Sequence, residues 1–97
     1  MERGGFVYIM TNKTHMVLYT GVTSALRNRI YEHMNNHYPK SFTSKYNCHK
    51  LVYHNFFWSI EEAIAEEKRI KAGSRLSKLI LINEFNPNWN DLFETLD

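Results

Sequence analysis

The sequence predicts a small α+β fold in which helices flank a mainly antiparallel sheet of three strands, in the order β-β-α-β-α-α. Short runs of β-branched and aromatic residues are typical of strands. Segments whose apolar residues recur at helical spacing predict helices. Both kinds intermix along a chain without an internal repeat or linker, which is typical of the α+β class. The strand runs lie at 6–10, 16–20 and 51–58, and the helical segments lie at 26–34, 60–71 and 76–83.

The first two runs predict a hairpin. Residues 6–10 (FVYIM) follow two glycines and are apolar throughout, so we expect a strand buried on both faces. Residues 11–15 are polar and include turn-forming side chains. Residues 16–20 (MVLYT) then return as the antiparallel partner.

The first helix follows this hairpin. Residues 26–34 place apolar side chains on one helical face, and Thr23 or Ser24 is the expected N-cap. Pro39 stops the helix, because proline cannot continue one. Residues 39–49 are polar, and we expect them to form a loop.

The second half of the chain predicts one strand and two longer helices. The strand at 51–58 leads into a helix whose start is marked by Ser59 and Glu62, spaced as in a capping box. Gly73 ends this helix, Ser74 or Ser77 starts the next one, and Asn86-Pro87 closes it. The remaining C-terminal segment has aromatic and leucine residues spaced as in a short final helix or a docked turn.

Composition limits the classes of protein. With 97 residues, 43% of them hydrophobic, residues 1–97 form one domain with a single core. The net charge of +2 permits a phosphate-bearing partner without indicating one. The lone Cys48 excludes an internal disulfide and a cysteine metal cluster. No secretory signal and no membrane-length apolar stretch is present, so we expect a cytoplasmic protein with no membrane partner.

Glu67 is the most informative polar residue. Its neighbours on the helical face are Ala63, Ile64 and Ile70, which places it within or beside the apolar stripe, whereas Glu66 is expected to be solvated. Burial of an unpartnered carboxylate is costly, so such a group is paired, protonated or bound to a cation. One alternative is a boundary residue that bonds a nearby Arg or Lys.

Four further side chains form a second set of candidates. Arg29 and His33 share a helix face, where the arginine suits a phosphate and the histidine suits a hydrogen bond or a proton transfer. Tyr8 and Tyr19 are central in the two hairpin runs. The alternatives are a solvated cationic helix surface and two core tyrosines.

A zinc site is the other chemistry considered. His33 and His37 have the spacing of a zinc-binding pair on a helix. The acidic residue of an HExxH motif is missing between them, and Cys48-His49 holds the only other soft donors. The sequence therefore disfavours zinc.

Together these residues resemble the GIY-YIG nuclease family, in its short branch similar to the N-terminal nuclease domain of excinuclease C. Phe6-Val7-Tyr8 stands where the family name has Gly-Ile-Tyr, and Tyr19-Thr20-Gly21 stands for Tyr-Ile-Gly. Ten residues separate the two tyrosines, and Arg29 lies ten positions beyond the second. The segments EKRIKAGSR and NPNWNDL also resemble short members, so the resemblance spans nearly the whole chain.

The resemblance implies a role for each candidate. Tyr8 and Tyr19 match the motif tyrosines, and Arg29 matches the helix arginine. His33 stands where the family carries His or Tyr. Glu67 matches the metal-binding glutamate. A final family asparagine corresponds to Asn90, with Asn86 as the alternative.

The implied activity is hydrolysis of phosphodiester bonds with Mg²⁺ or Mn²⁺, in DNA rather than RNA, in repair, recombination or processing. Two alternatives are a nucleic-acid-binding module that keeps the fold without cutting, and a protein-interaction domain with a lapsed site. The loop from Lys40 to Lys50, with Phe42 and Tyr46 among its lysines, is either a nucleic-acid edge or a solvated surface.

Overall fold

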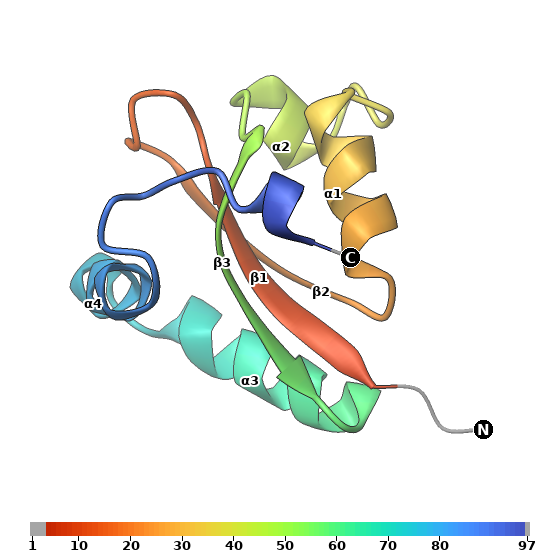
Figure 1. Cartoon of the computed structure of the whole chain (residues 1–97), viewed down its shortest axis with the longest axis vertical. Helices are drawn as coiled ribbons and strands as arrows, with labels where there is room; N and C mark the ends of the chain where they lie inside the picture. Colours follow the sequence, from red (N-terminus) through yellow and green to blue (C-terminus); the bar gives the residue numbers. More distant parts are fainter. Residues whose placement is uncertain (1–3, 97) are drawn as a thin grey trace.

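A computed structural model describes residues 4–96 and centres on a three-stranded sheet (Figure 1). The strands are β1 (Gly5–Thr11), β2 (Leu18–Thr23) and β3 (Lys50–Phe57), in the spatial order β2-β1-β3. Both neighbouring pairs are antiparallel, so β1 is central and β2 and β3 are the edges. The sheet confirms the predicted α+β class.

Helices cover both faces of this sheet (Figure 1). One face carries α1 and the C-terminal 3-10 helix η1, and the other carries α3 and α4. None of the helices in residues 4–96 combines the length and apolarity needed to cross a membrane. The helices are α1 (Leu26–Met34), α2 (Phe42–Lys45), α3 (Ile60–Ala72), α4 (Arg75–Phe85) and η1 (Phe93–Thr95).

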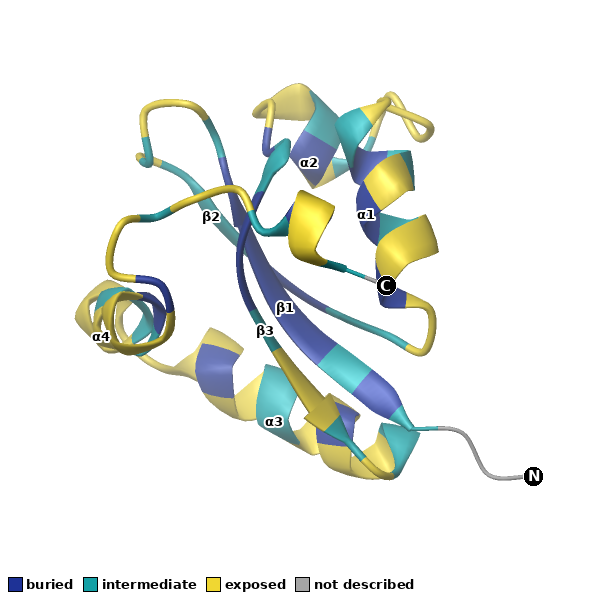
Figure 2. Ribbon diagram, in the orientation of Figure 1, coloured by how far each residue is buried: buried dark blue, intermediate teal, exposed yellow. Residues whose placement is uncertain are grey.

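The central strand separates two apolar clusters, one on each face of the sheet, where the composition predicted a single core. Val7 and Ile9 face α3 and α4, whereas Tyr8 and Met10 face α1 and η1. This alternation follows from the two-residue period of a strand. All four side chains are buried, which confirms that β1 is covered on both faces, and Figure 2 shows most of the strand in dark blue.

The second strand lies further along the chain than predicted. It begins at Leu18 because the Asn12 side chain accepts hydrogen bonds from the amides of Met16 and Val17, at 2.9 and 3.1 Å, and holds them in the turn. It also continues through Gly21 to Thr23, in register with Phe6 of β1. The predicted range of 16–20 was therefore wrong at both ends.

The start of α1 and the segment after it also differ from prediction. The N-cap of α1 is Ala25, without a side-chain bond, because Thr23 belongs to β2 and its hydroxyl accepts from the Ala25 amide at 3.1 Å. Residues 39–49 are not wholly loop, since they contain α2. The Ser41 hydroxyl caps this helix by accepting from the Ser44 amide at 3.3 Å.

The remaining strand and helix boundaries agree with prediction to within two residues. Ser59 caps α3 by accepting from the Glu62 amide, and Gly73 ends that helix. Ser74, rather than Ser77, caps α4. Asn86 is its C-cap.

The C-terminal segment is fastened to β3 by two sets of hydrogen bonds. Buried Asn86 donates to the carbonyls of Val52 and Asn90, at 3.2 and 2.8 Å. Further along, the Leu92 amide donates to the Leu51 carbonyl at 2.8 Å, and the Leu51 amide donates to the Asp91 carboxylate at 3.3 Å. The segment therefore lies along the outer edge of β3.

Candidate functional site

A buried chain of hydrogen bonds joins β1, α1 and α2. The Tyr8 hydroxyl lies 2.9 Å from His33 Nε2, and His33 Nδ1 lies 2.8 Å from the Thr43 hydroxyl. The Ser41 hydroxyl follows at 3.1 Å from Thr43. A neutral imidazole has one donor and one acceptor nitrogen, so the ring satisfies both neighbours at once.

Gly21 leaves space for the Tyr8 side chain, which begins this series of hydrogen bonds. It pairs directly with Tyr8 across β1 and β2, so both residues face α1. A Cβ atom on Gly21 would lie 2.4 Å from both Cζ and the hydroxyl oxygen of Tyr8. A glycine is therefore required at this position of the second motif, because the tyrosine of the first motif approaches too closely for any side chain.

A cavity of about 220 Å³ opens beside these hydrogen-bonded side chains. Tyr19 is half-buried and lines it, whereas Tyr8 is only 1% exposed and does not. The two motif tyrosines are therefore distinguished by access, which their spacing in sequence does not reveal. The lining residues are Tyr19, Arg29, His33, Tyr38, Ser41, Phe42 and Thr43.

Arg29 supplies the positive charge of the cavity. Its guanidinium lies 3.2 Å from the Glu32 carboxylate and 5.5 Å from the centre of the Tyr38 ring. It also lies near enough to the Tyr8 hydroxyl to favour the charged phenolate. A guanidinium has five N–H donors, so Glu32 leaves several of them for a ligand such as a phosphate.

Burial sets the protonation states of Tyr8 and His33 in this series of hydrogen bonds. It raises the pKa of Tyr8 well above its usual value of 10.0, with the nearby Tyr19 adding to the effect and Arg29 opposing it. Burial, with a smaller contribution from Arg29, lowers the pKa of His33 to about 4, against the opposing charge of Glu32. At neutral pH the tyrosine is therefore protonated and the histidine is neutral.

We expect this histidine to make folding stability depend on pH. Its pKa is lower in the folded state, so the unfolded chain binds more protons between pH 4 and 6.5. Its contribution is complete above pH 6.5 and falls as the pH drops toward 4, by about 3 kcal/mol in total. Urea unfolding of wild type and His33→Gln across this range measures the effect. His15 and His54 are retained in both proteins and contribute equally, so parallel pH profiles would contradict the assignment.

Glu67 lies on α3, where it packs on the other face of the sheet. Its side chain is 12% exposed and that of Glu66 is 20% exposed, so both carboxylates are half-buried and the expectation of a solvated Glu66 was wrong. Its carboxylate lies 2.6 Å from the ammonium of Lys71, which agrees with the alternative of a boundary carboxylate paired with a lysine. The cavity lies on the opposite face of the sheet and Glu67 does not line it, so the structure does not bring this residue together with Tyr19 and Arg29.

Asn90 does not line the cavity. It is exposed in the turn after α4, and its backbone amide donates to the Asn86 side chain at 3.1 Å. That turn is fastened to β3, so β1 and β3 separate it from β2. Asn86, the alternative assignment, is buried and holds the turn together. Neither position supports the role that the resemblance implied.

The described residues contain no group of three or more His, Cys, Asp or Glu side chains placed to hold a metal ion. A zinc pair at His33 and His37 is also contradicted, because Tyr8 and Thr43 occupy both ring nitrogens of His33. Mg²⁺ differs in that it retains several waters and binds through one or two carboxylates together with substrate phosphates. Glu67 provides one such oxygen donor.

The sequence reasoning did not identify Thr43, which completes the hydrogen-bonded chain. Ser41 and Ser44 have the spacing of a capped helix, and this signal could have placed Thr43 in an ordered turn. Nothing in the sequence pairs Thr43 with His33, since ten residues separate them along the chain.

Comparison with known proteins identifies the family of this chain. Residues 4–80 match the GIY-YIG catalytic domain. The chain is 36% identical over 84 residues to a UPF0213 protein of Syntrophus aciditrophicus (strain SB), covering 84% of this chain and 92% of that protein. No solved structure matches. The match over most of the chain shows that this protein belongs to the GIY-YIG family.

Proposed function

We propose that this protein is an endonuclease that hydrolyses phosphodiester bonds in nucleic acid with Mg²⁺ or Mn²⁺, and that DNA is its substrate. Membership of the GIY-YIG family supports a nucleic-acid-cleaving function. The observation that carries the proposal is one cavity lined by Tyr19, Arg29 and His33, with Tyr8 bonded behind it. A repair, recombination or processing context belongs to the same proposal.

The cavity supplies two of the chemical roles. Arg29 binds the scissile phosphate and neutralises charge that accumulates on it in the transition state. Tyr19 orients or deprotonates the attacking water, because it is the motif tyrosine that a ligand can reach.

His33 and Tyr8 are positioning residues. Both ring nitrogens of His33 are occupied, and its pKa of about 4 makes it a weak base at neutral pH. Tyr8 is buried, and its raised pKa keeps it protonated. Together they fix the neighbouring Tyr19 ring, whose centroid lies 6.2 Å from Tyr8 and 5.6 Å from His33.

Glu67 would hold the metal ion. A carboxylate is the hard oxygen donor that Mg²⁺ prefers, and Lys71, its present partner, is half exposed and free to move away. The ion would stabilise the departing 3′ oxygen.

Cleavage of plasmid and branched DNA by the purified protein tests the proposal. We expect activity with Mg²⁺ or Mn²⁺, loss of activity in EDTA, and a loss of about a hundredfold in Arg29→Ala. Arg69→Ala is the matched control, because it removes an exposed arginine on α3 that is paired with Glu66. Equal activity in wild type and Arg29→Ala would indicate a contaminant or a different site.

A non-cleaving nucleic-acid-binding module is the second candidate function. The observation that favours it is the ion pair between Glu67 and Lys71, because this lysine competes with a metal ion for the carboxylate. Tight binding of nucleic acid in EDTA, without products when metal is added, would support this candidate over the endonuclease.

A further inference from the structure

Three aromatic rings run in sequence from the cavity to the protein surface. The Tyr19 and Phe42 rings are stacked with centroids 5.8 Å apart, and the Phe42 and Tyr46 centroids are 4.7 Å apart. We call these three residues the aromatic ladder. Phe42 is 45% exposed and Tyr46 is 42% exposed, so part of each ring is available to a ligand.

The aromatic ladder is fixed to the site by the structure of α2. Ser41 caps this helix, and Thr43 within it bonds to His33. The Cys48 amide donates to the Thr43 carbonyl at 2.8 Å and closes the turn that follows. Phe42 is therefore held beside Tyr19 by the same bonds that build the cavity, which reduces the entropy lost when a ligand stacks on it.

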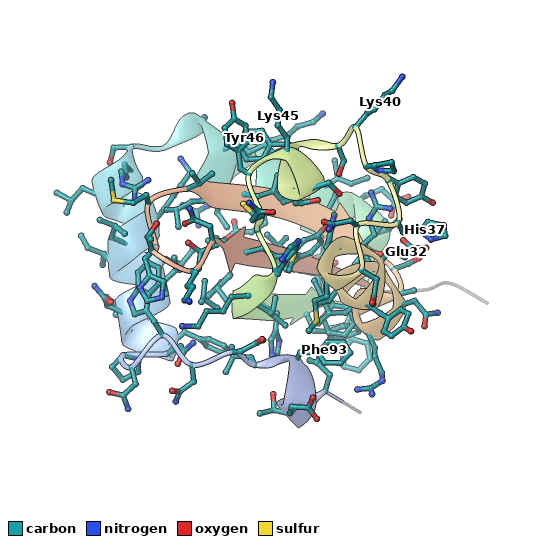
Figure 3. The ribbon with its side chains drawn as sticks, turned by 90° about the horizontal axis from the view of Figure 1, so that it is seen from above. Glu32, His37, Lys40, Lys45, Tyr46 and Phe93 are labelled. Atoms are coloured by element: carbon teal, nitrogen blue, oxygen red, sulfur yellow. The ribbon has the colours of Figure 1, made fainter. Side chains whose placement is uncertain are left out.

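The surroundings of the aromatic ladder are basic. Residues 33–60 contain no aspartate or glutamate. Lys45 Nζ lies 5.7 Å from the centre of the Tyr46 ring. Figure 3 shows Lys40, Lys45 and Tyr46 projecting outward from one side of the molecule. Arg29 lies at the inner end of the ladder, in the cavity. Cations therefore lie at both ends of the row of rings, with Arg29 in the cavity and Lys45 at Tyr46.

Rings with flanking cations are suited to unpaired nucleotides. A base can stack on a protein ring when one of its faces is free, and each such contact contributes about 1–3 kcal/mol. In a continuous duplex both faces of every base are covered by neighbouring bases. The backbone phosphates of a single strand would at the same time meet the lysines and Arg29.

We propose that the substrate carries unpaired nucleotides beside the scissile phosphate, and that their bases stack on the aromatic ladder of Tyr19, Phe42 and Tyr46. This inference rests on the proposed nuclease function, since it places the scissile phosphate at Arg29. DNA and RNA single strands share the chemistry, because both present free base faces and a phosphate backbone. A blunt duplex exposes base faces only at its two terminal pairs, and its backbone is stiff.

Binding without catalysis tests the inference. Fluorescence anisotropy in EDTA would compare the full chain on labelled oligo(dT) of about 15 nucleotides, oligo(U) of the same length and a blunt DNA duplex. We expect the single strands to bind at least about tenfold more tightly than the duplex. Stronger binding of oligo(U) than of oligo(dT) would identify RNA as the source of the strand.

Variants of the ladder identify the surface that binds. We expect Phe42→Ala and Tyr46→Ala each to weaken binding of single strands by about 5- to 100-fold while changing duplex binding little. Phe42→Leu retains apolar volume but removes the ring, so it separates lost stacking from lost folding. Trp58→Ala is the matched control, because Trp58 is an 83% exposed aromatic residue just beyond β3, at the opposite edge of the sheet.

Two results would overturn the inference: equal affinity for single strand and duplex, or single-strand binding unaffected by Phe42→Leu and Tyr46→Ala. Failure of the proposed function is a different result. If single strands bind through the ladder but no metal-dependent products form, the proposed endonuclease function is rejected and the ladder is supported as a binding surface. If blunt duplex and single strand are cleaved at equal rates, the endonuclease function is supported and the role of the ladder in substrate binding is rejected.

Discussion

Replacement of Glu67 by glutamine is expected to lower metal-dependent cleavage by about a hundredfold or more, with the fold retained. Glutamine preserves the size of the side chain but removes its charge, and a neutral amide oxygen is a weaker ligand for Mg²⁺ or Mn²⁺. Loss of one group that stabilises transition-state charge costs about 3 kcal/mol, which corresponds to that decrease in rate. Initial rates on the substrate that wild type cleaves, at matched metal concentrations, measure the effect.

The chain provides its own control in Glu66. It has the same charge, lies on the same helix, and is paired with Arg69 as Glu67 is paired with Lys71. We expect Glu66→Gln to retain activity close to wild type, since surface ion pairs contribute little to stability. Similar losses of cleavage activity in both variants would show that the effect comes from the overall charge of α3 and not from Glu67 itself. Full activity in Glu67→Gln would remove this residue from the site.

Replacement of Gly21 by alanine is expected to destabilise the protein by about 1–3 kcal/mol. The added methyl group would overlap the Tyr8 ring and hydroxyl, which are fully buried and bonded to His33. Either the tyrosine leaves its position or β1 and β2 separate. Urea unfolding measures the loss, and the absorbance of the buried tyrosine reports on the displacement of its ring.

Two comparisons test whether the contact with Tyr8 is the cause. Gly73→Ala also introduces a methyl group near other atoms, but the closest is the Ser77 hydroxyl, which can rotate away, and the next is the Ile70 carbonyl oxygen at 3.3 Å. We expect this variant to be nearly neutral. In a Tyr8→Ala background, Gly21→Ala should lose most of its effect, because the overlap no longer exists. An unchanged cost in that background would contradict the steric explanation.

The sequence contained enough information for the three strands and the longer helices, but not for α2 or for all the boundaries. The continuous apolar run of 6–10 predicted a fully buried strand, and β1 is one. The start of β2 depends on the Asn12 side chain, which competes with the strand ladder for two amides. The four residues of α2 are too few to show a helical period, so its region was interpreted as loop.

The site was predictable to the same partial extent. Spacing placed Arg29 and His33 on one face of α1, and they do line one cavity. Spacing could not distinguish Tyr8 from Tyr19, because their difference in exposure arises from packing of α1 and α2 against the sheet. It also could not locate Asn90, whose position is set by hydrogen bonds from Asn86 to the backbone of β3.

The attachment of the C-terminal segment affects where this protein can be shortened. The GIY-YIG match ends at residue 80, within α4, whereas the segment that bonds to Leu51 lies beyond it, at Asp91 and Leu92. A chain cut at the family boundary would leave the outer edge of β3 with unpaired amides and carbonyls. Exposed strand edges of this kind pair with other molecules and cause aggregation. We therefore expect the matched region expressed alone to aggregate more readily than the full chain.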